Sequence, residues 1–222
     1  MSSAIARASS ARLSASSVVS RARLARQTRV GRVRARARAV ARDERLGDLS
    51  DDAFAFEADK TLQTTRDART GKLRAIVFST TAGVDVREVE RLSAAVGWPE
   101  RPREKVKRAL ENSFMVATLY ECDIDELTGN VQETSRGRLI GCARATSDHV
   151  FNATLWDIMV DPEYQGLGYG KALVQQMIRV VLSRDVANVT LFADQDVIPF
   201  YRALGFVADP EGIRGMFLYD SA

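Results

Sequence analysis

The residues best suited to chemistry lie in the second half of the chain, where glycines follow a short apolar stretch. Residues 165–170 read Gln-Gly-Leu-Gly-Tyr-Gly, and a helical pattern begins at once after them. Glycines let a ligand approach the main chain without meeting a Cβ atom, and the start of a helix offers unpaired N–H groups and the positive end of the helix dipole. Because several donors follow one another, the stretch predicts a main-chain anion site that fits a diphosphate better than a carboxylate.

Three kinds of glycine-rich loop could explain this stretch. A phosphate loop of the Walker type has Ser or Thr after its Lys, but Ala172 follows Lys171 here. A dinucleotide fingerprint needs G-x-G-x-x-G, whereas the three glycines here alternate. The third pattern, Q/R-x-x-G-x-G/A after a strand, is matched by Gln165, Gly168 and Gly170. On these six residues alone, an ordinary strand-to-helix turn also stays open.

Two polar residues farther along could move protons. Tyr201 lies one turn into the short helix predicted at 197–205, and helix spacing leaves open whether it packs in the core or donates a proton. Asp194 ends the preceding predicted strand and could cap the helix. Asp196 is the better cap, because it places Pro199 in the first turn, where a missing N–H costs little. Asp194 is then free to act as a base or to relay a proton through water, and an efficient Asp base needs a raised pKa.

The predicted strand 153–160 carries one charged residue in an apolar run. Strand alternation places Trp156 and Asp157 on opposite faces, so both serve one site only if the strand bulges. Asp157 is either part of a structural hydrogen-bond network or a carboxylate that attracts a substrate ammonium, and Trp156 could offer an aromatic face. Asn188 is a further candidate polar contact near the same site.

A metal centre is not expected. The chain has one histidine, His149, and two cysteines, Cys122 and Cys142, without a Cys-x-x-Cys pair, whereas a zinc site needs about four such ligands. Both cysteines lie in strand-like runs and are predicted to be core residues, with a redox pair as the alternative. His149 lies in a predicted turn, and we expect it at the surface.

These residues must be positioned by a mixed set of strands and helices. Apolar runs predict strands, and apolar residues at helical spacing predict helices. The predicted strands are 73–80, 114–122, 138–146, 153–160, 188–194 and 215–219, with 206–207 as an optional further one, and the predicted helices are 85–97, 102–113, 167–184 and 197–205. Their order indicates an α+β fold, in which a mixed sheet carries helices on both faces.

The first 42 residues differ in composition from the rest of the 222-residue chain. They contain eleven Arg, eleven Ala and eight Ser and no acidic residue, which is typical of an organelle transit peptide. A basic arm that binds nucleic acid is the alternative. We therefore expect a transit peptide at 1–42, a loose polar linker at 43–71 and one domain at 72–222.

The rest of the chain is acidic. The first 42 residues contain 11 of the 32 Lys and Arg. Residues 43–222 therefore hold 21 Lys and Arg against all 29 Asp and Glu, a net charge of −8. Such a charge favours a cationic substrate through long-range steering. No apolar run approaches the roughly 18 residues that a membrane-spanning helix needs.

Together these motifs resemble the GNAT superfamily of N-acetyltransferases over residues 72–219. Two segments, ARATSDHVFNATLWDIMVDPEYQG and NVTLFADQDVIPFYRALGFVADPEGIRGMF, are similar to the plastid serotonin N-acetyltransferases of plants and algae. That group also includes members described as protein lysine and N-terminal acetyltransferases. The resemblance implies acetyl-CoA as donor and an amine acceptor. The residue types argue against a metal, and loss of the basic leader on import would leave no nucleic-acid site in the mature protein. It also implies the plastid stroma, and composition leaves the mitochondrion as the alternative.

The resemblance further implies a mixed central sheet of about six or seven strands, in which the strand at 153–160 bulges and splays from that at 188–194. The pantetheine arm would lie in this gap along the main chain of Ile158, Met159 and Val160. The diphosphate would be held by the turn, which comprises Gln165, Gly166, Leu167, Gly168, Tyr169, Gly170 and Lys171.

The same resemblance assigns the catalytic role of Tyr201, and the residue patterns above suggest the other catalytic and acceptor-binding roles. Tyr201 would contact the cofactor and protonate the departing thiolate, and Asp194 would act as base or relay. The acceptor, serotonin or another arylalkylamine, or a protein lysine or N-terminus, would be contacted by Trp156, Asp157, Asn188 and Asp194. A GNAT fold that holds acetyl-CoA or a partner protein without catalysis is the alternative.

Overall fold

A computed structural model describes residues 59–67, 70–134 and 137–216 of the chain. The expected transit peptide at 1–42 and the first part of the expected linker lie outside these residues. In the part of the chain that is described, no helix has the length and apolar character needed to cross a bilayer.

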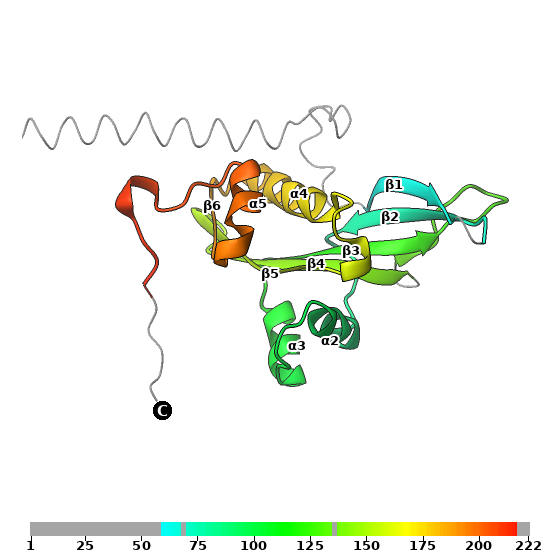
Figure 1. The fold of residues 1–222 in the computed structure, drawn as a ribbon, viewed down its shortest axis with the longest axis horizontal. Helices are drawn as coiled ribbons and strands as arrows, with labels where there is room; N and C mark the ends of the chain where they lie inside the picture. The colour runs from blue at the N-terminus through cyan, green and yellow to red at the C-terminus, as the bar shows by residue number, and fades with distance from the viewer. Residues whose placement is uncertain (1–58, 68–69, 135–136, 217–222) are drawn as a thin grey trace, which may run out of the picture. The chain divides into compact units, whose positions relative to one another are not determined.

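One sheet of six strands, ordered β1-β2-β3-β4-β5-β6, forms the centre of the fold (Figure 1). The strands are β1 Lys60–Arg66, β2 Leu73–Ser79, β3 Met115–Asp123, β4 Arg138–Ser147, β5 Asn152–Val160 and β6 Asn188–Leu191. Neighbouring strands from β1 to β5 are antiparallel, and β5 pairs with β6 in parallel. The predicted α+β class with a mixed sheet is therefore confirmed.

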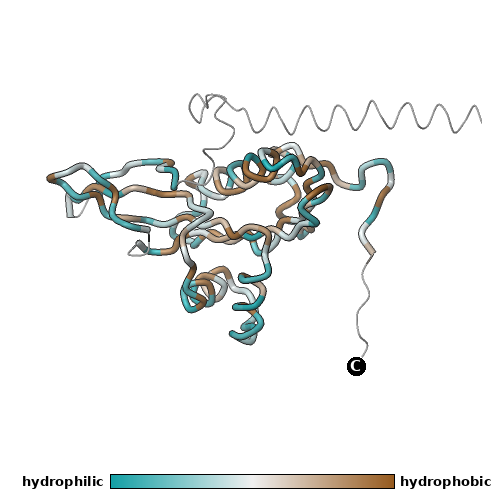
Figure 2. Tube along the Cα trace, turned by 180° about the vertical axis from the view of Figure 1, so that it is seen from behind, coloured by the Kyte–Doolittle hydropathy of each residue, from teal (hydrophilic) through white to brown (hydrophobic). Residues whose placement is uncertain are grey.

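Helices cover both faces of this sheet (Figure 1). Helices α2 Val86–Ala95 and α3 Arg103–Glu111 lie on one face, and α4 Tyr169–Ser183 lies on the other, followed later in the chain by the short α5 Ile198–Ala203. Hydrophobic segments of the tube in Figure 2 lie between the layers, and polar segments gather toward the outside and the loops. The layers therefore follow the apolar spacing of the sequence.

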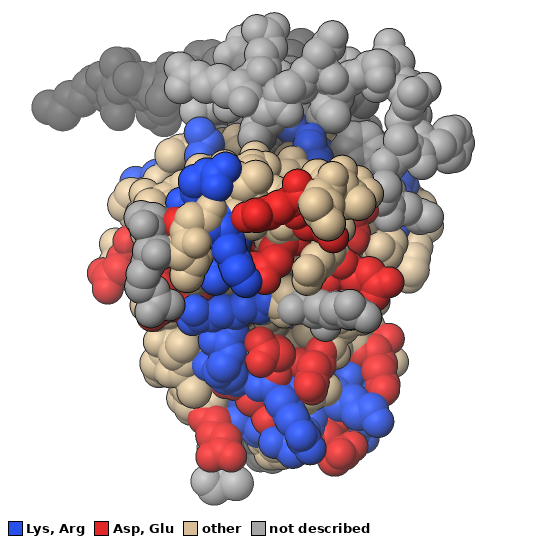
Figure 3. Space-filling view, turned by 90° about the vertical axis from the view of Figure 1, so that its right-hand side faces the viewer, with Lys and Arg blue, Asp and Glu red and all other residues tan. Residues whose placement is uncertain are grey.

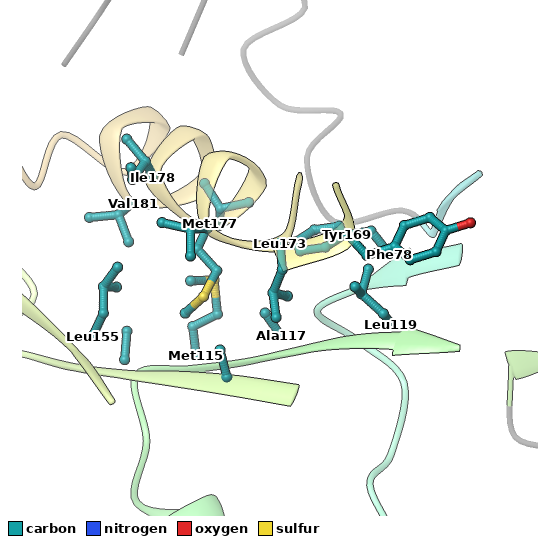
Figure 4. Close-up of a cluster of buried hydrophobic side chains, with 14 of the residues drawn as sticks. Phe78, Met115, Ala117, Leu119, Leu155, Tyr169, Leu173, Met177, Ile178 and Val181 are labelled. Atoms are coloured by element: carbon teal, nitrogen blue, oxygen red, sulfur yellow. The ribbon is translucent and has the colours of Figure 1, made fainter. Parts of the chain in front are cut away.

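Helix α4 packs on the sheet through apolar residues at intervals of three and four. Figure 4 shows this face above the sheet, where its side chains meet strand residues that also lack solvent exposure. The helix contributes Leu173, Met177, Ile178 and Val181, and the strands contribute Met115, Ala117, Leu119 and Leu155. This packing fixes the helix axis and so fixes where its N-terminus points.

A second cluster lies on the opposite face, under α2 and α3. Val89, Leu92 and Val106 of the helices pack with strand residues that include Cys122 and Cys142. Both cysteines are buried and have free thiols, as predicted for core residues. Burial raises the pKa of Cys122 to about 11 and that of Cys142 to about 12.

Three element predictions need correction. Residues 60–66, expected in a loose linker, form β1, an edge strand that pairs with β2; Lys60, Leu62 and Thr65 are half-buried and its other four residues are exposed. The strand expected at 188–194 ends at Leu191. Residues 206–207 and 215–216 lie in coil, and 217–219 of the expected last strand fall outside the described residues.

Candidate functional site

Strands β5 and β6 separate partway along their length. Their pairing runs from Asn152 opposite Asn188 to Leu155 opposite Leu191 and stops there. Strand β5 continues to Val160, whereas the chain after β6 turns into a short 3-10 helix, Gln195–Val197. Among the described residues, the main chain of 156–160 therefore has no strand partner on its β6 side, so the predicted splay is present.

Strand β5 also bulges at the start of the splayed part. Met159 pairs with Cys142 and Trp156 with Arg144, so two residues of β5 lie opposite one residue of β4. Asp157 at this bulge has φ +50°, a left-handed conformation that is uncommon outside glycine. The bulge that the resemblance implies is therefore present, and it interrupts the two-residue alternation of side chains at Trp156 and Asp157.

The carboxylate of Asp157 is held by two arginines. Arg101 Nη1 donates to Oδ1 at 3.1 Å, and Arg144 Nε donates to Oδ2. Arg101 comes from the connection between α2 and α3, and Arg144 comes from β4. This is the structural network that the sequence left open as one interpretation of Asp157. The two arginines were missed, because no local pattern pairs them with this strand.

Trp156 lies beside an aromatic neighbour where the two strands part. Its indole Nε1 donates to Thr146 Oγ1 at 2.8 Å, and its ring lies 5.4 Å from the ring of Phe192. Trp156 and Phe192 directly follow Leu155 and Leu191, the last paired residues of β5 and β6. The two rings therefore flank the opening of the splay, and Phe192 is 53% exposed there.

The glycine turn joins the end of β5 to α4. A 3-10 helix, Pro162–Tyr164, leads into Gln165, and Gly166 and Gly168 have φ +75° and +88°. Gly168 is the N-cap of α4, and a Cβ atom at either glycine would meet nothing within 4 Å. Both positions therefore need glycine for the backbone conformation, and they leave open space over the main chain.

Consecutive amides of this turn point away from internal acceptors. Among the described residues, the N–H groups of 166–171 have no protein acceptor, and the first one bonded afterwards is that of Ala172, which donates to Gly168 O at 3.0 Å. Gln165 ties the turn to β5, because its side-chain Nε2 donates to Val160 O at 2.9 Å. An anion of several oxygen atoms could accept from these amides at the positive end of α4.

The hydrogen bonds of Asp161, which precedes the glycine turn in the chain, were also missed from the sequence. Asp161, which is 3% exposed, accepts from Arg91 Nη1 at 3.1 Å, from Arg138 Nη2 at 3.0 Å and from the amide of Glu163 at 3.2 Å. Burial would raise the pKa of Asp161, but the amide of Glu163 and the two arginines outweigh burial and lower it. These bonds fix the direction in which the chain leaves β5 and enters the glycine turn.

Tyr201 lies on α5 beside other aromatic rings. Its ring is 5.0 Å from that of Phe200 and 5.9 Å from that of Phe206, and the side chain packs against the core cluster under α4. Burial raises the pKa of its phenol, and the negative charge of Asp194 adds to this rise. A phenol with a raised pKa keeps its proton at neutral pH and can donate it.

Helix α5 reaches the glycine turn through Phe200. A Cβ atom at Gly170 would lie 3.8 Å from Phe200 Cζ and 3.7 Å from Val160 Cγ2. The end of β5, the start of α4 and α5 therefore converge at Gly170. This convergence brings the glycine turn and the helix of Tyr201 to the same end of the splayed strands.

Asp194 rather than Asp196 stands at the cap position after β6. Asp194 is the N-cap of the 3-10 helix, but its side chain makes no capping bond among the described residues, and α5 begins at Ile198 with Pro199 in its first turn. The prediction that Asp196 caps the helix is wrong, since a 3-10 turn moves the start of the helix. Asp194 is exposed, and its carboxylate makes no capping hydrogen bond among the described residues.

Asn188 lies apart from this convergence, whereas Leu167 and Tyr169 belong to the glycine turn itself. Asn188 Nδ2 donates to Asn152 Oδ1 at 2.6 Å at the closed end of the strand pair, three residues before the splay begins. Tyr169 points inward and its hydroxyl donates to Gln63 at 2.9 Å, while Leu167 is 62% exposed. His149 lies in a turn with φ +65° and its ring contacts Phe114. Among the described residues, no group of three or more His, Cys, Asp or Glu could hold a metal ion.

A separate cavity of about 500 Å³ lies on the α2–α3 side of the sheet. Its lining includes Trp98, Glu90 and four arginines at 87, 91, 101 and 103. Arg91 and Arg101 reach from this lining to Asp161 and Asp157. On the face that Figure 3 shows, basic and acidic side chains lie next to each other, as such ion pairs require.

Comparison with known proteins agrees with this geometry. Residues 86–206 match the model of the acetyltransferase (GNAT) family. A chloroplastic GCN5-related N-acetyltransferase 2 from Arabidopsis thaliana is 51% identical over 160 residues, which cover 69% of this chain and 62% of that protein. A histone acetyltransferase TAP1 from Glycine max is 54% identical over 150 residues, covering 67% of this chain and 63% of that protein. The chain thus spans less than two thirds of the length of these relatives.

Two further comparisons extend the similarity. A chloroplastic serotonin N-acetyltransferase 2 from Oryza sativa subsp. japonica is 39% identical over 145 residues, covering 65% of this chain and 68% of that protein. The crystal structure of a probable acetyltransferase from meticillin-resistant Staphylococcus aureus has a TM-score of 0.51 at 23% identity, covering 64% of this chain and 99% of that one, and it supports the fold. Since the family model matches more than half of its length, this chain belongs to the GNAT acetyltransferase family.

Proposed function

We propose that this chain transfers the acetyl group of acetyl-CoA to a primary amine. GNAT acetyltransferases use acetyl-CoA, and the observation that carries the proposal here is the run of amides at 166–171 that have no acceptor among the described residues. They lie beside the stretch of β5, residues 156–160, whose β6 side has no strand partner in the same part of the chain. The amides suit the diphosphate of coenzyme A, with Gln165 and Lys171 at the two ends of the turn. The main chain of Ile158, Met159 and Val160 suits the amide-bearing pantetheine arm, which can pair with it as a short strand does.

The chain's own residues would handle the protons of the reaction. A primary amine of the lysine type has a pKa of about 10, so it must lose a proton before it attacks the thioester. Main-chain N–H groups of the splayed strand would stabilise the oxygen that becomes negative during transfer. Tyr201 would protonate the departing thiolate, because a phenol has an ordinary pKa of about 10 and carries its proton at neutral pH; burial raises this pKa further.

Asp194 is proposed to meet the amine. Its carboxylate is exposed, makes no capping bond among the described residues and acts on Tyr201 through its charge. It could draw in an ammonium and accept the proton directly or through water. The net charge of −8 over residues 43–222 would steer cationic acceptors in the same direction.

The acceptor is proposed to be an arylalkylamine such as serotonin, with protein lysines and N-termini as the second branch. The rings of Trp156 and Phe192, 5.4 Å apart at the opening of the splay, support the first branch because they can stack on an aromatic ring. One relative is a serotonin N-acetyltransferase and another a histone acetyltransferase, so relatives of both kinds exist. A GNAT fold that binds acetyl-CoA without catalysis stays the alternative.

The plastid stroma is the proposed location. The acid-free, Arg-rich leader at 1–42 has transit-peptide composition, and two relatives are named chloroplastic. A fluorescent fusion of the full chain should enter plastids, and a fusion that lacks 1–42 should stay outside. A full-length fusion that remains in the cytosol would contradict this proposal.

The proposed reaction is tested by offering acceptors in parallel. The purified full chain is incubated with acetyl-labelled acetyl-CoA and either serotonin or a stromal extract, and label is measured in amine and in protein. We expect labelled N-acetylserotonin, and labelled protein without it would select the second branch. If neither accepts label while calorimetry shows acetyl-CoA binding, the non-catalytic alternative holds.

A further inference from the structure

We infer that Asp157 is a positioning residue, whose carboxylate holds the bulge of β5 through Arg101 and Arg144 and does not itself receive the acceptor amine. This inference rests on the proposed function for its kinetic consequence. The ion pairs and the backbone conformation that support it are features of the structure itself.

The backbone at Asp157 needs support from its surroundings. Its φ of +50° lies in the left-handed region, which residues other than glycine adopt rarely, although Asp tolerates it better than most. Such conformations persist where neighbouring groups hold them, and they gather at functional sites. Here the neighbouring groups are the two guanidinium groups on the same residue's carboxylate.

The two arginines reach Asp157 from different directions. Arg144 is the β4 residue that pairs with Trp156, so its bond to Asp157 lies across the bulge. Arg101 comes from the α2–α3 connection, 56 residues away in the chain. Asp157 therefore links β4, β5 and the helical layer at the point where β5 leaves β6.

The charge balance argues against an ammonium at the same carboxylate. One negative charge faces two positive ones, and each carboxylate oxygen already accepts from a guanidinium. The side chain of Asp157 is 20% exposed and that of Arg144 is 17% exposed, so solvent screens their pair only in part. An incoming cation would meet a net positive charge at Asp157. The carboxylate of Asp194, in contrast, makes no capping hydrogen bond among the described residues.

A displaced bulge would harm the proposed reaction. The residues after the bulge, Ile158 to Val160, are those proposed to align the pantetheine arm and to present an N–H group to the thioester oxygen. A displacement of about 1 Å at reacting atoms can cost on the order of 100-fold in rate. Loss of the ion pairs of Asp157 with Arg101 and Arg144 should therefore lower kcat more than it raises the KM for the amine.

Arg101→Gln separates the two roles of Asp157, because they predict opposite effects. If Asp157 positions the bulge, Arg101→Gln lowers kcat by about tenfold or more and leaves the amine KM within about twofold. If Asp157 binds the amine, removal of a competing cation lowers the KM and leaves kcat unchanged. Arg103→Gln is the matched control, since Arg103 lies in the same segment but pairs with Glu90, away from β5.

Substitutions of Asp157 itself give a second, independent test. Asp157→Gly and Asp157→Asn both remove the charge, but glycine and asparagine accept a positive φ. Asp157→Ala removes the charge and also disfavours the conformation. The inference expects Ala to have the lowest kcat of the three, with Asn and Gly retaining several-fold more activity. An equal rise of the amine KM in all three variants would overturn the inference.

The assay uses the full chain, with wild-type turnover measured first. Wild-type protein that binds acetyl-CoA but acetylates no amine would refute the proposed function. Turnover by the wild type together with unchanged kcat in Arg101→Gln would refute the inference alone. Amide hydrogen exchange gives a readout besides activity: peptides covering 156–160 should exchange several-fold faster in Arg101→Gln than in Arg103→Gln, and equal exchange would also overturn the inference. Circular dichroism confirms that each variant is folded.

Discussion

Replacement of Gly168 by Ala tests the central role of the glycine turn. Gly168 has φ +88° and is the N-cap of α4, and the added methyl group would meet no atom within 4 Å. Any effect of Gly168→Ala therefore comes from the backbone and not from a clash. A residue other than glycine in a left-handed conformation costs about 1–2 kcal/mol.

This cost should appear as a lower unfolding free energy of the free protein, as weaker coenzyme A binding, or as a part of each. If the free protein keeps the turn as it is, the variant loses about 1–2 kcal/mol of unfolding free energy, and its melting temperature falls by about 2–4 °C for each kcal/mol. If the free turn relaxes and must be restored on binding, the same energy weakens coenzyme A binding by about 5- to 30-fold. The two losses together should reach at least about 1 kcal/mol.

Gly97→Ala provides the control for strain without a binding role. Gly97 has φ +79° after the end of α2, and a methyl group there would also meet no atom within 4 Å. We expect Gly97→Ala to lower the melting temperature without any change in coenzyme A affinity. Thermal melts and isothermal titration of coenzyme A measure both quantities. A folded Gly168→Ala protein with wild-type melting temperature and wild-type affinity would refute the role assigned to the turn.

Three further outcomes are expected. Tyr201→Phe keeps the ring contacts with Phe200 and Phe206 but removes the proton, so turnover should fall about 100-fold at unchanged coenzyme A affinity; unchanged turnover would remove Tyr201 from the mechanism. Asp161→Asn removes a buried carboxylate whose pKa is lowered, and because its arginine partners are partly exposed the loss at pH 7 should be about 1–3 kcal/mol. The stability that a lowered pKa confers is present above the unfolded pKa of about 3.9 and is lost as pH falls through the folded pKa, so urea melts of wild type and variant should converge below about pH 4; a constant difference would contradict this. Cys122 and Cys142 have pKa values raised to about 11 and about 12 by burial, so a thiol reagent at pH 8 should label neither in the folded protein and both in denaturant.

Much of the fold could be predicted because its signals are local. The apolar spacing of α4 and the apolar runs of β2 to β5 predicted these elements within a few residues. Strand β1 was missed because its sequence, KTLQTTR, has one apolar residue and offers little to bury. An edge strand needs main-chain partners on one side only, and a polar sequence can supply them.

Near the turn after β6, sequence patterns misplaced both the end of the strand and the cap of the following helix. The apolar run NVTLFAD suggested a strand to 194, but pairing stops at Leu191, where β5 and β6 diverge. Asp196 looked like the better cap because Pro199 needs a place in the first turn, and a 3-10 turn from Gln195 to Val197 provides that place differently. Divergence of strands depends on what packs around them, which a single stretch of sequence does not encode.

The two halves of the candidate site differ in the same way. The glycine turn could be predicted from adjacent residues, since alternating glycines before a helical pattern favour the positive φ angles seen at Gly166 and Gly168. The carboxylate at the bulge has partners 13 and 56 residues away, Arg144 and Arg101, and Asp157 in isolation predicts only that some partner exists. Sequence could therefore predict a main-chain anion site at the turn, but not the two arginines that bond Asp157 in the strand beside it. A substitution in the α2–α3 connection should accordingly disturb the proposed acetyl transfer while leaving the glycine turn intact. The connection reaches β5 through the Arg101–Asp157 pair, whereas the entry to the turn is held separately by Arg91 and Arg138 on Asp161.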